Sequence, residues 1–118
     1  MMKRENTSKE MEFSYDAIND LLYVYKKDTK VDYNEAIGDI HIEFTKSGKA
    51  IGVEILNASD ILKEFDIPQK MLDHLTGAEL KVVKNGAAFL VLLTLHSENN
   101  EKSAMIALSP TAQAIHAV

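Results

Sequence analysis

Residues 39–56 read DIHIEFTKSGKAIGVEIL, and this stretch decides the fold. Apolar and polar residues alternate on both sides of a polar Lys-Ser-Gly-Lys segment at positions 46–49. Alternation with a period of two is typical of a strand with one buried face, so the stretch predicts a β-hairpin. A shift of the register by one residue would expose half of the apolar side chains, so we expect a firmly set register. The expected facing pairs are Phe44 with Ile51, Ile42 with Val53, and Ile40 with Ile55.

The apolar period changes after the hairpin, which predicts two short helices. In the first helix, apolar residues recur at helical spacing, and the side chain of Asn57 or Ser59 is expected to cap the first turn. The second helix is predicted to begin at Asp66 as N-cap, with Pro68 in its first turn, and to end at Gly77.

Further strands are predicted on both sides of this central region. Residues 21–25, LLYVY, are rich in aromatic and branched residues and read as a strand, and residues 28–34 read as a polar connection. The Asn85-Gly86 pair is a strong hairpin signal and predicts a three-stranded meander over residues 80–108. Its middle strand is apolar on both faces, so we expect a helix or a partner subunit to cover the second face.

The predicted order is β-β-β-α-α-β-β-β, an α+β fold in which antiparallel hairpin and meander halves flank two short central helices. We expect one domain over residues 1–118, with a flexible tail at 1–11, a β-rich half at 12–62, and a helix with a three-stranded meander at 63–118. The pattern leaves open whether the strands form one mixed sheet or two packed sheets. A short C-terminal helix is expected after Ser109.

Composition excludes several functional classes. The chain is 46% hydrophobic and carries a net charge of −5, with lysines scattered among acidic residues, so a basic surface for nucleic acid is not expected. It contains no cysteine, which excludes a disulfide, a thiolate nucleophile and a Cys-based metal site. The longest uncharged run, residues 86–97, is far shorter than the roughly 20 residues of a membrane helix. The segment MMKRENTSKE lacks the apolar centre of a secretory signal, so we expect a cytoplasmic protein without a membrane or nucleic-acid partner.

The best candidate for chemistry is the polar face of the first hairpin. The predicted register places His41 opposite Glu54 and Glu43 opposite Gly52, with Asp39 on the same face. Carboxylates and an imidazole can bind a divalent metal or a cationic ligand, and Gly52 would leave room for one. The simpler interpretation is a solvated face with ordinary cross-strand charge pairs. The candidate ligand-binding residues are therefore Asp39, His41, Glu43 and Glu54.

No catalytic residue and no cofactor is predicted. The motifs for dinucleotides, phosphates, hydrolases, zinc peptidases and calcium are absent from the sequence. His41-Ile42-Glu43 matches half of the zinc deaminase signature, but the other half requires cysteines that the chain lacks.

Three segments resemble a known protein family. They are Tyr15-Asp16, the segment 20–24 (DLLYV), and the segment 52–59 (GVEILNAS). Over about residues 13–62 the chain is similar to the prokaryotic family catalogued as domain of unknown function 2283, and the residues beyond would be a C-terminal extension. The turn at 46–49 departs from the Asp-rich turn common in the family, and Asn19 stands where the family often has Ala. The resemblance implies a small β-rich domain without an established activity, some relatives of which resemble accessory partners of small toxin-like proteins.

The sequence favours a non-catalytic protein that acts through protein–protein association. A homo-oligomer or a complex with a small protein is expected, with an antitoxin-like regulator as one variant. The alternative is a ligand- or metal-binding protein, or an enzyme, that uses the polar hairpin face.

Overall fold

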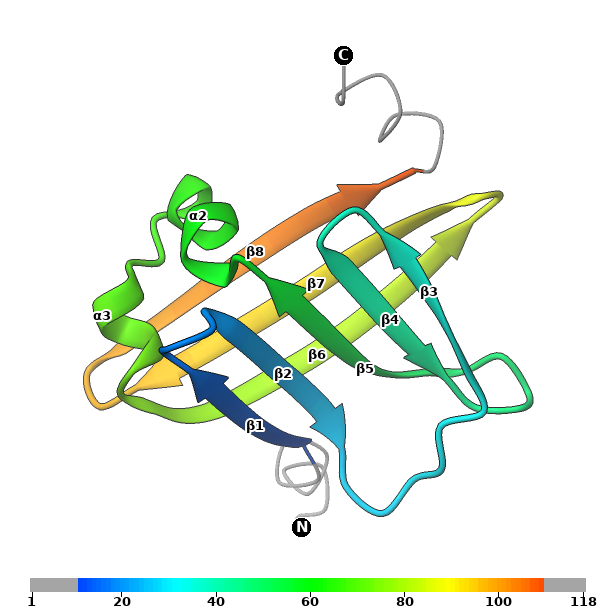
Figure 1. Ribbon diagram of the computed structural model, residues 1–118, viewed down its shortest axis with the longest axis horizontal. Coiled ribbons are helices and arrows are strands. Elements are labelled where there is room, and N and C mark those ends of the chain that lie inside the picture. The colour runs from blue at the N-terminus through cyan, green and yellow to red at the C-terminus, as the bar shows by residue number, and fades with distance from the viewer. Residues whose placement is uncertain (1–10, 110–118) are drawn as a thin grey trace, which may run out of the picture.

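The computed structural model describes residues 11–109, which form two antiparallel β-sheets and three short helical segments (Figure 1). The first sheet has five strands in the order β1-β2-β5-β4-β3, and the second has three in the order β6-β7-β8. The predicted tail up to residue 10 and the predicted helix after Ser109 lie outside the described residues.

The strands of the first sheet are β1 (Met11–Asp16), β2 (Leu21–Lys26), β3 (Tyr33–Ile37), β4 (Ile40–Phe44) and β5 (Ala50–Leu56). The strands of the second sheet are β6 (Leu75–Asn85), β7 (Ala88–Ser97) and β8 (Asn100–Leu108). The connection between the sheets contains the helix α2 (Ala58–Leu62), the 3₁₀ turn η2 (Lys63–Phe65) and the helix α3 (Gln69–Leu72).

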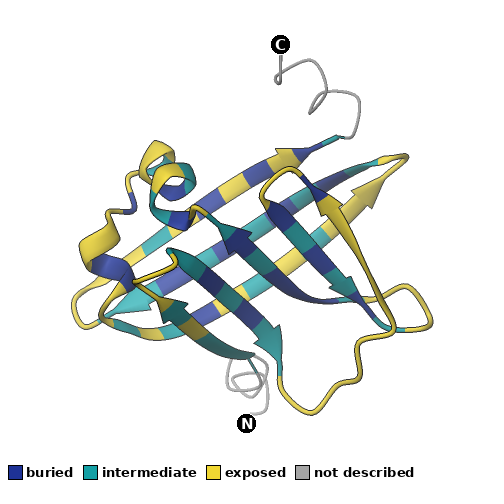
Figure 2. Ribbon diagram, viewed as in Figure 1, coloured by how far each residue is buried: buried dark blue, intermediate teal, exposed yellow. Residues whose placement is uncertain are grey.

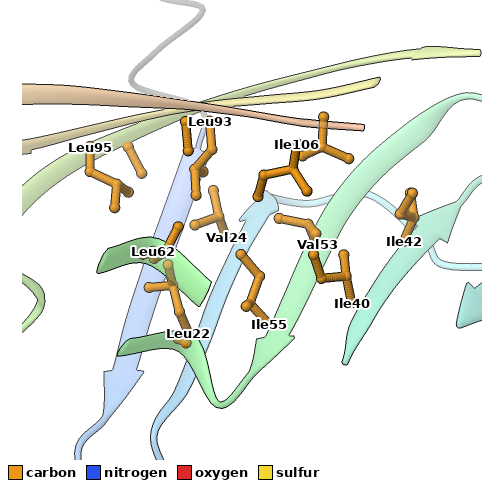
Figure 3. Close-up of a cluster of buried hydrophobic side chains, with 14 of the residues drawn as sticks. Leu22, Val24, Ile40, Ile42, Val53, Ile55, Leu62, Leu93, Leu95 and Ile106 are labelled. Atoms are coloured by element: carbon orange, nitrogen blue, oxygen red, sulfur yellow. The ribbon is translucent and has the colours of Figure 1, made fainter. Parts of the chain in front are cut away.

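The two sheets pack face to face, and the strands of one cross those of the other (Figure 1). Along most strands buried residues alternate with more exposed ones, as the banding in Figure 2 shows. Leu93, Leu95 and Ile106 of the three-stranded sheet face the side chains of β2 and β5 across the core (Figure 3). Each fully buried aliphatic side chain contributes roughly 1.5–3 kcal/mol through removal of apolar surface from water.

The α+β class is confirmed, but most of the structure is strand and the predicted order is incomplete. The sequence did not reveal β1 or β3, and β3 begins at Tyr33, inside the segment expected to be a polar connection. The reason is that β3 is an edge strand whose first four residues are all exposed, so its sequence YNEAI lacks the alternating pattern. The helices lie together at one end of the two sheets rather than between two halves (Figure 1).

The register of the first hairpin follows the prediction for two of its three apolar pairs. Ile40 lies opposite Ile55, and Ile42 lies opposite Val53. The expected pairing of Phe44 with Ile51 is wrong, because the register shifts after Glu43 and Phe44 pairs with Ala50. Such a β-bulge places one extra residue in a strand, and here Ile51 stays buried in spite of it.

The second predicted helix is much shorter than expected. Pro68 has an extended backbone and α3 covers only Gln69–Leu72, while Asp66 takes a left-handed conformation at the end of η2 instead of capping a helix. Gly77 does not end a helix but lies within β6, beside a register shift against β7. Met71 and Leu72 are buried, so this single turn covers the end of the core before the chain enters the second sheet.

The meander is confirmed, with the tight turn at 86–87, one residue later than predicted. The residues that the alternation places on its inner face are buried in the core, except that Leu80 and Val82 are half-buried and pack against it. They are Leu80, Val82, Phe89, Val91, Leu93, Leu95, Ala104, Ile106 and Leu108.

Candidate functional site

The predicted ligand-binding residues lie at the outer face of the five-stranded sheet or at its edge. His41 faces Glu54 as predicted, and its Nδ1 lies 3.8 Å from Glu54 Oε1. Asp39 is in the turn before β4, where its carboxylate accepts a hydrogen bond from Asn57 Nδ2 at 3.3 Å. The structure therefore pairs two of the four residues directly, and Asp39 has a separate partner.

The fourth residue, Glu43, is held by a tyrosine. The Tyr23 hydroxyl donates a hydrogen bond of 2.7 Å to Glu43 Oε1, and the Tyr23 ring stacks on Tyr25 with centroids 4.4 Å apart. Burial and the bond to Glu43 raise the pKa of Tyr23 well above its usual range. A Cβ built on Gly52 would lie 2.5 Å from Glu43 Oε1, so the space that the glycine leaves is used by Glu43 itself.

This polar face combines carboxylates, an imidazole and aromatic rings, but its groups mostly bind one another. Within residues 11–109, no group of three or more His, Asp or Glu side chains is arranged to hold a metal ion. A ligand-binding role for the four residues stays a prediction.

A second polar cluster joins the segments that carry the family resemblance. Asp20, in the turn between β1 and β2, accepts hydrogen bonds from the Tyr15 hydroxyl at 2.5 Å and from the Ser59 hydroxyl at 2.7 Å. The backbone N–H of Ser59 also donates to Asp20, and Gln69 Nε2 donates to the Tyr15 hydroxyl at 3.0 Å. Asn57 holds the N-cap position of α2 without a side-chain cap bond, so the predicted capping by Asn57 or Ser59 is wrong and Asp20 takes this role.

The hydrogen bonds of this cluster shift the pKa values of Asp20 and Tyr15. Burial alone would raise the pKa of Asp20, but the bonds from Tyr15 and from both donors of Ser59 lower it below its usual value. Burial and the bond to Asp20 raise the pKa of Tyr15. Because the side chains of Tyr15 and Ser59 both hydrogen-bond to Asp20, the cluster ties together the segments that carry the family resemblance, and we call it the Asp20 lock.

The outer face of the three-stranded sheet carries an apolar surface. Met105 is 60% exposed and Val83 is 41% exposed, while Leu90 and Leu92 between them on β7 are half-buried. Within the described part of the chain the other sheet packs on the opposite face (Figure 1), so no sheet covers this one. We call this the apolar surface, and its members are Val83, Ala88, Leu90, Leu92, Met105 and Ala107.

Sequence reasoning found the β7 part of this surface and missed the rest. Leu90 and Leu92 were visible because β7 is apolar on both faces. Val83 and Met105 were not singled out, although the period of two in β6 and β8 places them on the outer face.

Charged groups border the apolar surface at one end. His96 Nε2 lies 3.0 Å from Glu79 Oε2, and its Nδ1 lies 3.6 Å from Glu101 Oε1. These polar contacts form a rim beside the apolar residues, an arrangement that is common at protein–protein interfaces.

Among residues 11–109, no helix is long and apolar enough to cross a membrane. Comparison with known proteins gives one curated relative, an uncharacterized protein from Methanocaldococcus jannaschii, which is 34% identical over 64 residues. The match covers 52% of this chain and 55% of the relative, so the chain spans about half the length of that protein. No solved structure matches the chain.

The family match covers one of the two sheets and not the other. The matched segment covers nearly all of the five-stranded sheet and ends at Ser59, the residue that locks onto Asp20, whereas the three-stranded sheet lies beyond it as a C-terminal extension. The resemblance seen in the sequence is confirmed: residues 12–59 match the family described as protein of unknown function (DUF2283).

Proposed function

We propose that this protein is a non-catalytic, cytoplasmic binding protein that acts through protein–protein association at the apolar surface. The observation that carries the proposal is the exposure of Met105 and Val83 beside Leu90 and Leu92 on one sheet face. Contiguous exposed apolar residues with a polar rim mark interaction sites, because leaving them in water forgoes the free energy of burial.

The location of the surface supports this role. It lies on the extension beyond the family-like half, so it can serve a function of its own without disturbing the Asp20 lock. The preferred form is a homo-oligomer. A regulator that masks a small protein partner, in the manner of an antitoxin, is a variant that uses the same surface.

The experiment compares the wild-type chain with a double variant, Leu92→Glu with Met105→Glu. Both side chains point outward, so the change places two charges on the surface without entering the core. Size-exclusion chromatography with light scattering, and affinity purification with a tagged chain, measure self-association and partner binding. We expect the wild type to form a complex and the double variant to run at the mass of one chain. Ala36→Glu, on the exposed edge strand of the other sheet, is the matched control and is expected to behave like the wild type.

The proposal is wrong if the wild-type chain is a monomer and no bound protein is lost in the double variant. Urea unfolding of both chains shows whether the double variant is still folded, because an unfolded variant would lose its cooperative transition.

A second candidate function is the binding of a small cation at the outer face of the five-stranded sheet. The His41–Glu54 pair and the Glu43 carboxylate beside the stacked Tyr23–Tyr25 rings favour it. A thermal-shift screen with divalent ions and cationic metabolites tests it. A rise in Tm that disappears in His41→Ala with Glu54→Ala supports the site, and a screen without any such rise removes it.

A further inference from the structure

The two segments outside the described part of the chain differ in composition. Residues 110–118 read PTAQAIHAV and contain five apolar residues and no Asp, Glu, Lys or Arg. Residues 1–10 read MMKRENTSKE, and five of these ten residues are charged. Charged side chains are well solvated in water, whereas apolar side chains gain free energy when they bury surface against other apolar groups. Of the two, the 110–118 segment is therefore the one that matches the apolar surface in chemistry.

The 110–118 segment also begins beside the apolar surface. β8 ends at Leu108, directly after Ala107, which is a member of that surface. Successive outward residues of a strand are about 7 Å apart, so Ala107 and Met105 lie about 7 and 14 Å along β8 from Ser109. Nine residues span about 30 Å when extended and about 13 Å as a helix. A Ser-Pro pair favours a turn, and after a reversal there the segment is long enough to lie over both outward rows.

The spacing within the segment gives it one apolar side. Ala112, Ile115 and Val118 recur every three residues and fall on one side of a helix, while Gln113 and Ala117 fall on the opposite side. The helix that the sequence predicts after β8 would thus carry an apolar stripe. Such a helix is the cover that β7 requires, because β7 is apolar on both faces.

We propose that the 110–118 segment packs on the apolar surface of its own chain, and that a partner has to displace it. The inference rests on the proposed function, to which it adds a competitor built into the chain. Because the segment is tethered at the edge of the surface, its effective concentration there is on the order of millimolar. A weak contact is therefore populated in a single chain, and the partner meets only the fraction of chains whose surface is uncovered.

The chain contains no cysteine, so a nitroxide can be attached at one introduced thiol. Ala117→Cys places this label on the side of the predicted helix that faces away from the stripe. In a dilute sample we expect the nitroxide to broaden the methyl NMR signals of Leu92 and Met105. The methyl signals of Leu21, on β2 of the other sheet, should stay sharp.

Two further substitutions test whether the stripe makes the contact. Ile115→Glu places a charge in the centre of the stripe, so the same label should no longer broaden Leu92 and Met105. Gln113→Glu is the matched control, because it adds the same charge on the opposite side and should leave the broadening unchanged. A mixture of nitroxide-labelled chain with isotope-labelled chain that lacks a thiol should show no broadening, since the contact lies within one chain.

Removal of residues 110–118 tests the competition. If the segment covers the surface nine-tenths of the time, the shortened chain should form the complex at about ten-fold lower concentration than the full chain. Light scattering over a dilution series, or titration of a partner recovered by affinity purification, measures this shift.

Broadening that Ile115→Glu removes and Gln113→Glu preserves supports the inference, as does the ten-fold shift. No broadening, equal broadening in both variants, or broadening in the mixture overturns it. Complexes of equal strength from the full and shortened chains also overturn it, while the proposed function stands. If the segment covers the surface but neither chain forms any complex, the proposed function is wrong and the covering contact remains.

Discussion

Ser59 donates its backbone N–H and its hydroxyl to the carboxylate of Asp20, a residue 39 positions earlier in the sequence. The backbone N–H of Ala58 adds a bond of 3.0 Å to the Asp20 carbonyl oxygen. Asp20 thus serves as the cap of α2 from a distant turn and ties that turn to the end of β5. This contact fixes where the chain leaves the five-stranded sheet on its way to the second sheet.

The first prediction concerns the strength of this lock. Asp20 has a positive φ of 53°, a conformation that Asn also tolerates, so Asp20→Asn removes the carboxylate with little backbone strain. We expect a loss of about 1 kcal/mol in the free energy of unfolding, as for other lost helix caps. Urea denaturation measures it. Asp28→Asn is the matched control, because Asp28 is exposed and has a φ of 59°, and it should change stability far less.

The second prediction concerns pH. The pKa of Asp20 in the folded chain is below its ordinary value of 3.8, so the unfolded chain binds a proton first as the pH falls. The contribution of the carboxylate is therefore complete well above pH 3.8 and is lost as the pH falls through 3.8 toward the folded pKa. The stability difference between the wild type and Asp20→Asn should be constant near neutral pH and shrink in acid. A difference that stays the same throughout the acid range would contradict the assigned role.

The third prediction concerns Gly52. A Cβ at this position would lie 2.5 Å from Glu43 Oε1 and 3.2 Å from Tyr25 Cβ, so Gly52→Ala should displace Glu43 from Tyr23. In the wild-type background we expect a loss of about 1 kcal/mol, of the size of one hydrogen bond. In a Glu43→Ala background the same change should cost less or even stabilise the chain, because alanine is favoured over glycine within a strand by about 0.5–1 kcal/mol.

A double-mutant cycle with urea unfolding measures this coupling. Gly77→Ala is the control glycine, since its Cβ would meet His96 at an ordinary contact distance of 3.5 Å. Equal effects of Gly52→Ala in the two backgrounds would show that Glu43 does not use the space.

The fourth prediction separates the two faces of β7. Leu93 is completely buried between the sheets, whereas Leu92 beside it points to the outer face. Leu93→Ala should cost about 2–5 kcal/mol because it leaves a cavity in the core. Leu92→Ala should cost about 1 kcal/mol or less in a single chain. Chemical denaturation at low protein concentration checks both values, and similar losses would contradict this difference between the two faces.

Much of the architecture could be predicted from local pattern. The alternation in residues 39–56 gave the first hairpin and the facing of His41 with Glu54, because each strand buries one face. The same reasoning gave the inner face of the meander and the doubly apolar β7. The edge strand β3 could not be predicted in this way, because its first four residues are all exposed and its sequence shows no alternation of apolar and polar residues. The second helix was overestimated, because capping residues indicate where a helix can begin but not how soon the chain must enter the next strand.

The sequence by itself determined the strand faces, the family resemblance and the absence of cysteine chemistry, since these follow from residue type and spacing alone. Only the tertiary structure decided that the strands form two sheets, that Asp20 caps a helix 39 residues away, and that Glu43 fills the space beside Gly52. The physical reason is that local spacing specifies which side of a strand is apolar, whereas the partner on that side depends on how distant segments meet.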